Sequence, residues 1–306
     1  MTGANVLFDA PGPRARRRSL IISIIAGVLV LGGLVWVISM LAAPREASGG
    51  LVLPGQFDPT RWNIYANPAV WAAIGGGVVR TLQAAAVAAV LALILGVVFS
   101  LLRSSTIAWV RVPTAVVLEF IRGMPVLLMM LFILLVASTG QYWAVVSALA
   151  LYNGAIIGEA LRAGLASLPR GQREAALSVG MRELQSKFLI EFPQAFRQML
   201  PIIVAQLVVL LKDTALGFIV GYNELIRTTM YNLAAFVGNR YLFSLFFITL
   251  VIYLIINLTL SWFARWLSRR TASGGRKVKG KPVDPTQGLL VAQAAAAAQE
   301  EGGRRP

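Results

Sequence analysis

The chain has 306 residues, of which 57% are hydrophobic and only 13% are charged. Soluble globular domains carry about 25% charged residues, so this composition excludes an ordinary soluble protein and indicates several apolar helices that cross a membrane. The net charge of +15 lies mostly in tails and loops beside apolar runs, which favours orientation in a membrane and contact with its lipids over nucleic-acid binding. The chain has no Cys and no His, which excludes thiol chemistry and any metal site built on His.

The N-terminal region begins with a basic tail, residues 1–18, followed by an apolar run over 19–43. A cleaved signal peptide is the alternative, but its apolar core has about 7–15 residues, so we expect an additional N-terminal membrane helix that is retained. Residues 44–69 are rich in Pro and Gly and poor in positive charge, which predicts an extracytoplasmic loop.

Residues 70–267 are expected to form the main membrane domain. The predicted spans after the first are 70–102, 112–137, 142–163, 200–220 and 241–267. The fold class is therefore all-α, a polytopic membrane protein with six transmembrane helices. With six spans, both termini and most Lys and Arg residues fall on one side, which predicts that this side is the cytoplasm.

A charged island over about 165–197 separates two of these spans. Pro169 and Gly171 are expected to open it, Gly180 to interrupt it and Pro193 to close it. A charged helix–Gly–helix at a membrane surface is suited to docking against another protein, whereas the simpler alternative is a solvated connection. The candidate coupling residues are Arg173, Glu174, Ala175, Ala176, Gly180 and Pro193.

Charged residues inside the spans form a second candidate site, because an ionisable group at membrane depth needs a partner or a polar cavity. Glu119 and Arg122 lie three apart on one helical face, whereas Lys212 and Asp213 are adjacent and must find partners elsewhere, such as that first pair. The alternatives are a central substrate pathway and a structural ion-pair network. The candidate pathway residues are Glu119, Arg122, Lys212, Asp213 and Thr214. Glu159 and Arg162 have the same spacing, and we expect a structural role for them.

The tail 268–306 is basic and then Ala-rich, which predicts a disordered cytoplasmic segment. It contains an incomplete phosphate-loop pattern, in which Pro282 stands where a Mg²⁺-binding Ser or Thr is required. We therefore expect no nucleotide site, no cofactor and no metal on this chain, and no enzymatic activity of its own.

Four segments carry a family pattern: 77–83 with 101–105, 119–127, 154–180, and 193–216. Together they resemble the permease subunits of polar amino-acid ABC importers, in which the Glu-Ala-Ala and Gly180 motif belongs to the EAA coupling loop. Met124 stands where the family usually has Thr, and Phe192 where it usually has Leu.

The resemblance implies a five-helix type I importer core with one added N-terminal helix. It also implies four kinds of partner: a cytoplasmic ABC ATPase dimer that holds ATP and Mg²⁺, a second permease that is identical or a paralogue, an extracytoplasmic amino-acid-binding protein, and membrane lipids. Glutamate or a near relative is the leading substrate. The alternatives are a secondary transporter or channel that works without an ATPase and a membrane scaffold without transport activity.

Overall fold

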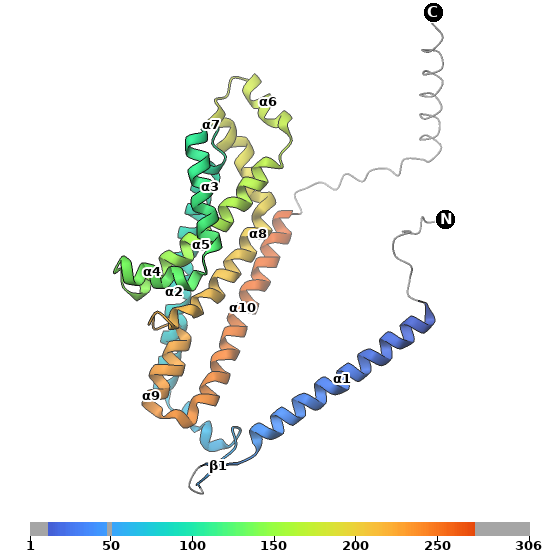
Figure 1. Cartoon of the computed structure of the whole chain (residues 1–306), viewed down its shortest axis with the longest axis vertical. Helices are drawn as coiled ribbons and strands as arrows, with labels where there is room; N and C mark the ends of the chain where they lie inside the picture. Colours follow the sequence, from blue (N-terminus) through green and yellow to red (C-terminus); the bar gives the residue numbers. More distant parts are fainter. Residues whose placement is uncertain (1–11, 48–50, 273–306) are drawn as a thin grey trace, which may run out of the picture.

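The computed structural model describes residues 12–47 and 51–272, and these are almost entirely helical (Figure 1). The long helices are α1 (Pro13–Ala42), α2 (Pro68–Arg103), α3 (Ala108–Gly123), α5 (Gln141–Ala166), α8 (Phe192–Asp213) and α10 (Leu242–Ala272). The short α-helices are α4 (Val126–Val136), α6 (Arg170–Ser178), α7 (Glu183–Ser186) and α9 (Ala234–Val237). The 3₁₀- and π-helices are η1 (Pro59–Arg61), η2 (Asn63–Ala66), η3 (Lys187–Glu191), η4 (Thr214–Phe218), η5 (Arg227–Leu233) and η6 (Asn239–Tyr241).

Five helical segments of the described chain are long and apolar enough to cross a membrane, and a bent pair of helices makes a sixth. The five are Pro13–Ala42, Pro68–Arg103, Gln141–Ala166, Glu183–Phe218 and Asn239–Trp266. The prediction of an all-α, multi-pass membrane fold is confirmed. Strand structure in the described residues is limited to a small hairpin, β1 (Arg45–Ala47) and β2 (Leu51–Leu53), in which Arg45 pairs with Leu53.

The predicted span over 112–137 is not one continuous helix, because α3 and α4 meet at an angle of 105°. The break lies at Met124 and Pro125. Proline lacks the N–H that a helix interior requires, and it pushes the preceding residue into extended geometry. Met124 accordingly has φ −87° and ψ 132°.

The expectation that Pro193 closes the island is also wrong, because helical structure runs on from Glu183 into α8. Pro193 lies in the first turn of α8, where a missing N–H costs little. The π-helix η3 ends directly before α8, so the helix is locally wider where the island joins the bundle.

The boundaries at the two ends of the chain also differ from those expected. Helix α1 begins at Pro13, so Arg14, Arg16, Arg17 and Arg18 lie on its first turns rather than in a separate tail. At the other end α10 continues to Ala272, and the phosphate-loop-like pattern lies outside the described residues.

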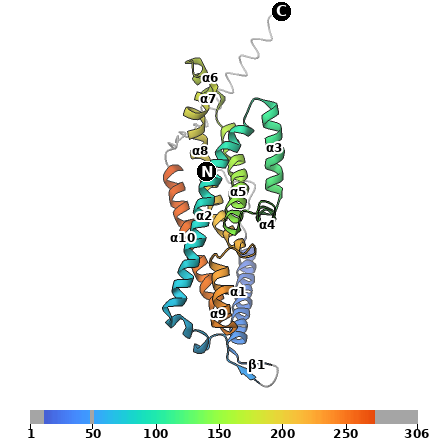
Figure 2. The same ribbon diagram turned by 90° about the vertical axis from the view of Figure 1, so that its left-hand side faces the viewer.

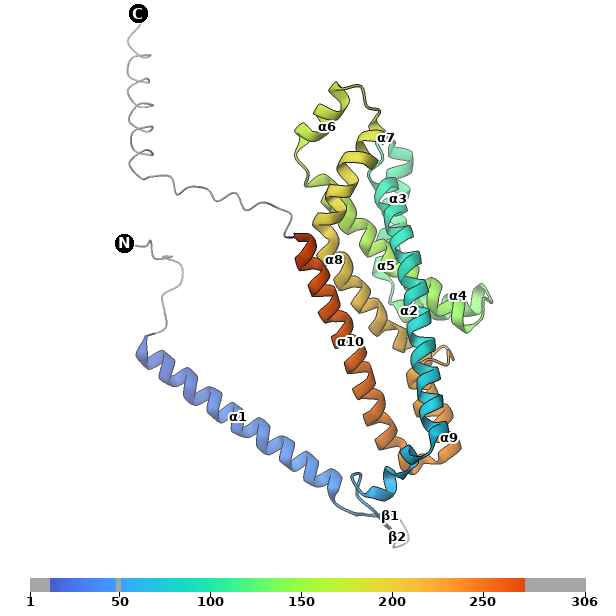
Figure 3. The same cartoon turned by 180° about the vertical axis from the view of Figure 1, so that it is seen from behind.

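Two apolar cores hold the bundle together. The larger core lies among α2, α4, α5 and α8, and the smaller one joins α2 to η5, α9 and α10. Helix α1 stands apart from the bundle in Figures 1 and 3, overlaps it in the turned view of Figure 2, and has no buried residue. Its exposed apolar side chains are what a lipid-facing helix requires.

The closest helix pairing is that of α2 with α5, and small residues make it possible. A Cβ placed on Gly96 would lie 2.6 Å from Cγ2 of Ile157, and one on Gly158 would lie 2.8 Å from Cβ of Phe99. In a membrane, where lipid is as apolar as Leu, such close backbone packing is a main source of helix association. Gly154 and Gly158 lie four residues apart, one helical turn, and both face α2.

Candidate functional site

The charged island forms α6, α7 and η3 at the end of the bundle opposite the β1–β2 hairpin (Figures 1 and 3). Helix α6 ends at Gly180, which has φ +84°. The Gly180 N–H donates to the carbonyl of Leu177, and the Met181 N–H donates to that of Ala176. These two bonds form a Schellman motif, in which a glycine in left-handed geometry satisfies the last carbonyls of a helix. Gly180 therefore separates α6 from α7 by a defined turn.

Polar contacts tie the island to itself and to the bundle. Arg173 in α6 forms an ion pair with Glu183 in α7, with 2.8 Å between Nη2 and Oε1. Lys187 Nζ donates to the carbonyl of Ser104, just past the end of α2, at 2.9 Å. The island thus has one contact across its turn and another to a different membrane helix, which restrict its motion relative to the bundle.

The Glu-Ala-Ala segment presents two of its residues to solvent and one to the protein. Glu174 and Ala175 are exposed, whereas Ala176 is 3% exposed. The island also carries exposed apolar side chains at a polar end of the molecule: Leu177, Val179, Leu184 and Leu189. Exposed apolar side chains grouped with charges are typical of a protein-binding surface.

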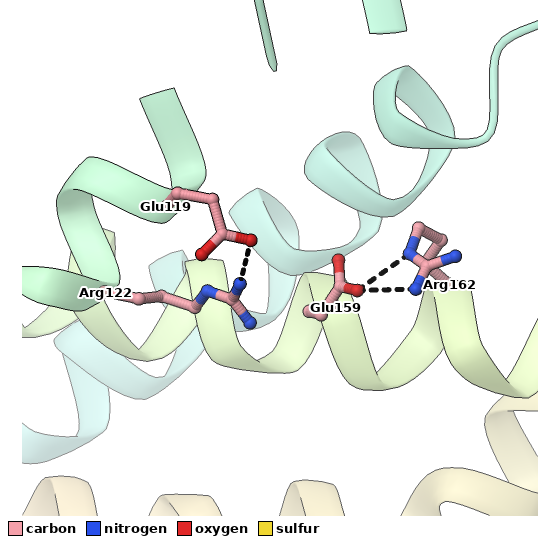
Figure 4. A network of polar contacts seen from close by, with 4 residues as sticks. All are labelled: Glu119, Arg122, Glu159 and Arg162. Carbon is pink, nitrogen blue, oxygen red and sulfur yellow. Dashed lines mark hydrogen bonds and ion pairs between the residues drawn. The ribbon is translucent and has the colours of Figure 1, made fainter. Parts of the chain in front are cut away.

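The charged residues of the spans form ion pairs within single helices (Figure 4). Arg122 pairs with Glu119 in α3 at 2.5 Å. Arg162 pairs with Glu159 in α5 at 2.6 Å. Figure 4 shows Arg122 between the two carboxylates, and its charge acts on Glu159 as well. The two helices therefore share one small network of alternating charge.

The structure does not bring Lys212 and Asp213 to that network. Among the described residues, no ion pair joins either residue to Glu119 or Arg122. Lys212 instead lines a groove of about 430 Å³ between α8 and α10, together with Arg265. Thr214 is buried, and its hydroxyl donates to the Leu211 carbonyl at 2.6 Å. The expected pairing across the bundle is therefore wrong, and Glu119 and Arg122 form their ion pair with each other within α3.

Sequence reasoning missed a buried carboxylate, Glu224, in the segment between α8 and α10. It is fully buried and accepts hydrogen bonds from the N–H groups of Ile226 and Arg227 and from the Tyr253 hydroxyl in α10. The same segment binds α2 through Thr81, whose hydroxyl accepts from the Leu225 N–H at 3.0 Å. The available signal was an acidic residue directly before a helical turn that begins at Leu225, which is an N-terminal capping pattern.

A second missed pair joins α5 to α8. Gln206 Nε2 donates to Oδ1 of Asn153 at 2.8 Å, and Asn153 is fully buried. Its own amide nitrogen donates to the Leu149 carbonyl. A buried amide pair in a membrane bundle fixes the register of two helices, because a slip would leave both groups unsatisfied.

Together these features define a class: a multi-pass helical membrane protein with a polar network in its spans and a rigid, charged helical loop at one end. Searching the described residues for His, Cys, Asp and Glu clusters finds no group suited to a metal ion. Residues 88–273 match the family described as the binding-protein-dependent transport system inner membrane component. The chain belongs to this family of transport permeases.

Characterised relatives agree with this assignment. The chain is 38% identical over 247 residues to the glutamate transport system permease protein GluD of Corynebacterium glutamicum, covering 77% of this chain and 89% of that protein. It is 33% identical to the probable glutamine ABC transporter permease protein GlnP of Bacillus subtilis, covering 63% of this chain and 91% of the relative. The resemblance to polar amino-acid ABC permeases stated from the sequence is confirmed.

Solved structures show the same fold. A crystal structure of an amino acid ABC transporter with histidines matches with a TM-score of 0.60 and 28% identity, covering 70% of this chain and 98% of that one. The inward-facing methionine ABC transporter MetNI matches with a TM-score of 0.56 at 17% identity, over 67% of this chain and 99% of that one, which supports the fold alone.

Proposed function

We propose that this chain is the membrane-spanning subunit of an ATP-driven importer for a polar amino acid, with glutamate as the leading substrate. The observation that carries the proposal is the folded island, α6 to η3, which is held to the bundle and exposes both charge and apolar side chains. A transporter that works alone needs no such surface. The relatives of this chain include a glutamate permease and a probable glutamine permease. We choose glutamate as the leading substrate because the glutamate permease is the more similar of these two.

The island is the proposed contact with a separate ABC ATPase dimer, which binds ATP and Mg²⁺. Glu174, Ala175 and the exposed apolar residues would enter a groove on that partner, while Ala176 and Gly180 shape the loop. The ion pair from Arg173 to Glu183 would keep α6 and α7 moving together. A displacement of the ATPase would then reach α5 and α8, which flank the island.

The proposed complex places the island and both chain termini in the cytoplasm. A second permease, identical or a paralogue, completes the pathway, and an extracytoplasmic binding protein delivers the amino acid. In this arrangement 44–69 form the extracytoplasmic loop, 70–267 the permease domain and 268–306 a cytoplasmic tail. The positive-inside rule supports the orientation, because most basic residues outside the spans fall on the side of the island.

Arg122 is the residue that we propose for contact with a substrate carboxylate. Its Nη2 is paired with Glu119, whereas its buried Nε has no acceptor among the described residues. Arg122→Ala is expected to reduce uptake and leave association with the ATPase intact. If the variant instead fails to fold, the role of Arg122 is structural.

The first experiment is a mild-detergent pull-down of the full chain from its native membrane, with identification of the co-purifying proteins. Recovery of an ATPase with Walker motifs supports the proposal and shows whether one or two kinds of permease are present. Repeated recovery of the intact, folded chain alone contradicts it and favours the ATPase-free carrier.

The coupling role is tested with the double variant Glu174→Lys, Gly180→Pro. It is expected to insert into the membrane and to lose both ATPase association and uptake. Normal uptake by this variant contradicts coupling through the island. Competition of labelled glutamate uptake by unlabelled glutamine and arginine then tests the substrate, and stronger competition by either than by glutamate itself would replace the leading choice.

A further inference from the structure

Three arginines gather around one pocket at the hairpin end of the molecule. The pocket has a volume of about 390 Å³ and lies between the end of α1, the segment after β2 and η6. Its charged lining residues are Arg45, Arg61 and Arg240, and no acidic residue lines it. Two of the three come from the segment before the permease domain and one from the loop before α10, so the site exists only where these segments meet.

The walls of this pocket are held by hydrogen bonds. Arg61 donates from Nε to the Pro54 carbonyl and from Nη1 to the Arg240 carbonyl, at 3.1 and 2.9 Å. Arg240 donates to the Tyr241 hydroxyl and lies over the Tyr241 ring, with its guanidinium carbon 4.5 Å from the ring centre. These contacts fix two guanidinium groups in place with part of their donor capacity unused.

Arg45 supplies the third charge from β1. It is exposed, and the described residues include no hydrogen-bond or ion-pair partner for its side chain. The neighbouring Glu46 points to the other face of the strand, because side chains alternate along β-structure. Asp58 lies within electrostatic reach of Arg61, but it does not line the pocket and it accepts two bonds from Thr60. The pocket therefore holds an excess of positive charge.

The position of the pocket in the membrane follows from the ends of the spans. Ala43, which lines it, directly follows α1, and Arg240 lies two residues before α10. Figure 3 shows the end of α1, the hairpin and the starts of α2 and α10 at the same end of the molecule. Trp62, Tyr65 and Trp71 pack against one another at this end. Such aromatic groups mark the level of the lipid headgroups.

We propose that Arg45, Arg61 and Arg240 bind the phosphate of an anionic phospholipid headgroup in the leaflet at the hairpin end. Guanidinium groups match phosphate oxygens with paired, charge-assisted hydrogen bonds. The adjacent apolar surface of α1 is available to the acyl chains. This site joins the additional N-terminal helix to the permease core through a lipid, and it requires neither the ATPase nor the amino-acid substrate of the proposed function.

The test is native mass spectrometry of the full detergent-purified chain titrated with phosphatidylglycerol. Arg45→Gln is the informative variant, because this side chain supports no other contact in the described structure. Its apparent dissociation constant for the lipid is expected to be about tenfold higher. Arg45→Lys keeps the charge and is expected to retain most of the binding. Arg111→Gln, an exposed arginine at the other end of the molecule, removes the same charge and is expected to bind as the wild type does.

Two results with the variants would overturn the proposal, and a third comes from competition with phosphate. One is unchanged lipid affinity in Arg45→Gln, and the other is an equal loss in Arg45→Gln and Arg111→Gln, which would reflect net charge alone. Inorganic phosphate added at the same concentration is expected to leave the lipid complex intact. Displacement by inorganic phosphate would assign the pocket to a free anion in place of a lipid.

Discussion

The hydroxyl of Tyr253 in α10 donates a 2.7 Å hydrogen bond to the carboxylate of Glu224, which is fully buried. This contact joins the last membrane helix to the segment that leads into η5. The hydroxyls of Thr81 and Thr214 lie near the same phenol oxygen, so α2 and η4 meet at this point as well. Glu224 and Tyr253 together therefore lie where four parts of the chain meet.

Replacement of Tyr253 by Phe should destabilise the fold by about 2 kcal/mol, because a buried carboxylate loses one charge-assisted donor. Thermal unfolding in detergent measures the loss. Tyr231→Phe is the matched control, since its side chain is 53% exposed and its ring contacts with Phe218 and Arg227 survive the change. Equal melting temperatures for the two variants would show that the Tyr253 hydroxyl contributes nothing.

Gly180→Ala should destabilise the island, because an L-residue in left-handed geometry costs about 1–2 kcal/mol and φ here is +84°. Hydrogen exchange of the Met181 amide, which caps α6, reports the change locally. Gly171→Ala is the control in the same helix. Nothing lies near its added Cβ and its φ is not positive, so α6 should gain about 0.5–1 kcal/mol. Unaltered protection of Met181 in Gly180→Ala would contradict the Schellman assignment.

Gly96→Ala should separate α2 from α5, because the new Cβ would lie 2.6 Å from the Ile157 side chain. Overpacking of this kind costs about 1–3 kcal/mol. Gly27→Ala places the same methyl group on α1 in open space and should not lower the melting temperature. A loss of stability as large in Gly27→Ala would mean that helix composition, not packing, determines the effect.

The stability of η1 should depend on pH in the acid range. Asp58 Oδ1 accepts hydrogen bonds from the hydroxyl and the backbone N–H of Thr60. These bonds, the hydroxyl bond above all, hold the pKa of the Asp58 carboxyl below its ordinary value. A carboxyl with a lowered pKa in the folded state adds stability above its unfolded pKa, about 3.9, and that stability is lost as pH falls through the folded value. Wild type should therefore exceed Asp58→Asn in melting temperature at neutral pH, and the difference should vanish in acid. A constant difference would contradict the assignment.

The sequence predicted the spans and the island because these depend on local pattern. Continuous apolar runs fix the membrane helices, and Gly180 fixes its turn through its own backbone freedom. The break at Met124–Pro125 was not predicted, although a proline inside an apolar run is a local signal for it, and α4 beyond the 105° bend packs against α5.

The buried polar pairs could not be predicted in the same way. Whether Glu224 meets Tyr253, or Asn153 meets Gln206, depends on register between helices that are far apart in sequence. The hypothesis that Lys212 and Asp213 pair with Glu119 and Arg122 failed for the same reason. Glu119 and Arg122 pair with each other because they lie three residues apart on one helix. No local pattern showed where the C-terminal end of α8, with Lys212 and Asp213, would lie.

Helix α5 begins at Gln141, whose side chain lies against Gly221, and ends at Ala166, just before the island. Its 26 residues span about 39 Å at 1.5 Å per residue. Gly154 and Gly158 let its backbone approach the side chains of α2, and Gly96 lets α2 approach Ile157, so α5 packs tightly against α2. In the proposed importer, α5 would therefore carry a movement applied at α6 to the turn before Glu224 as one rigid helix.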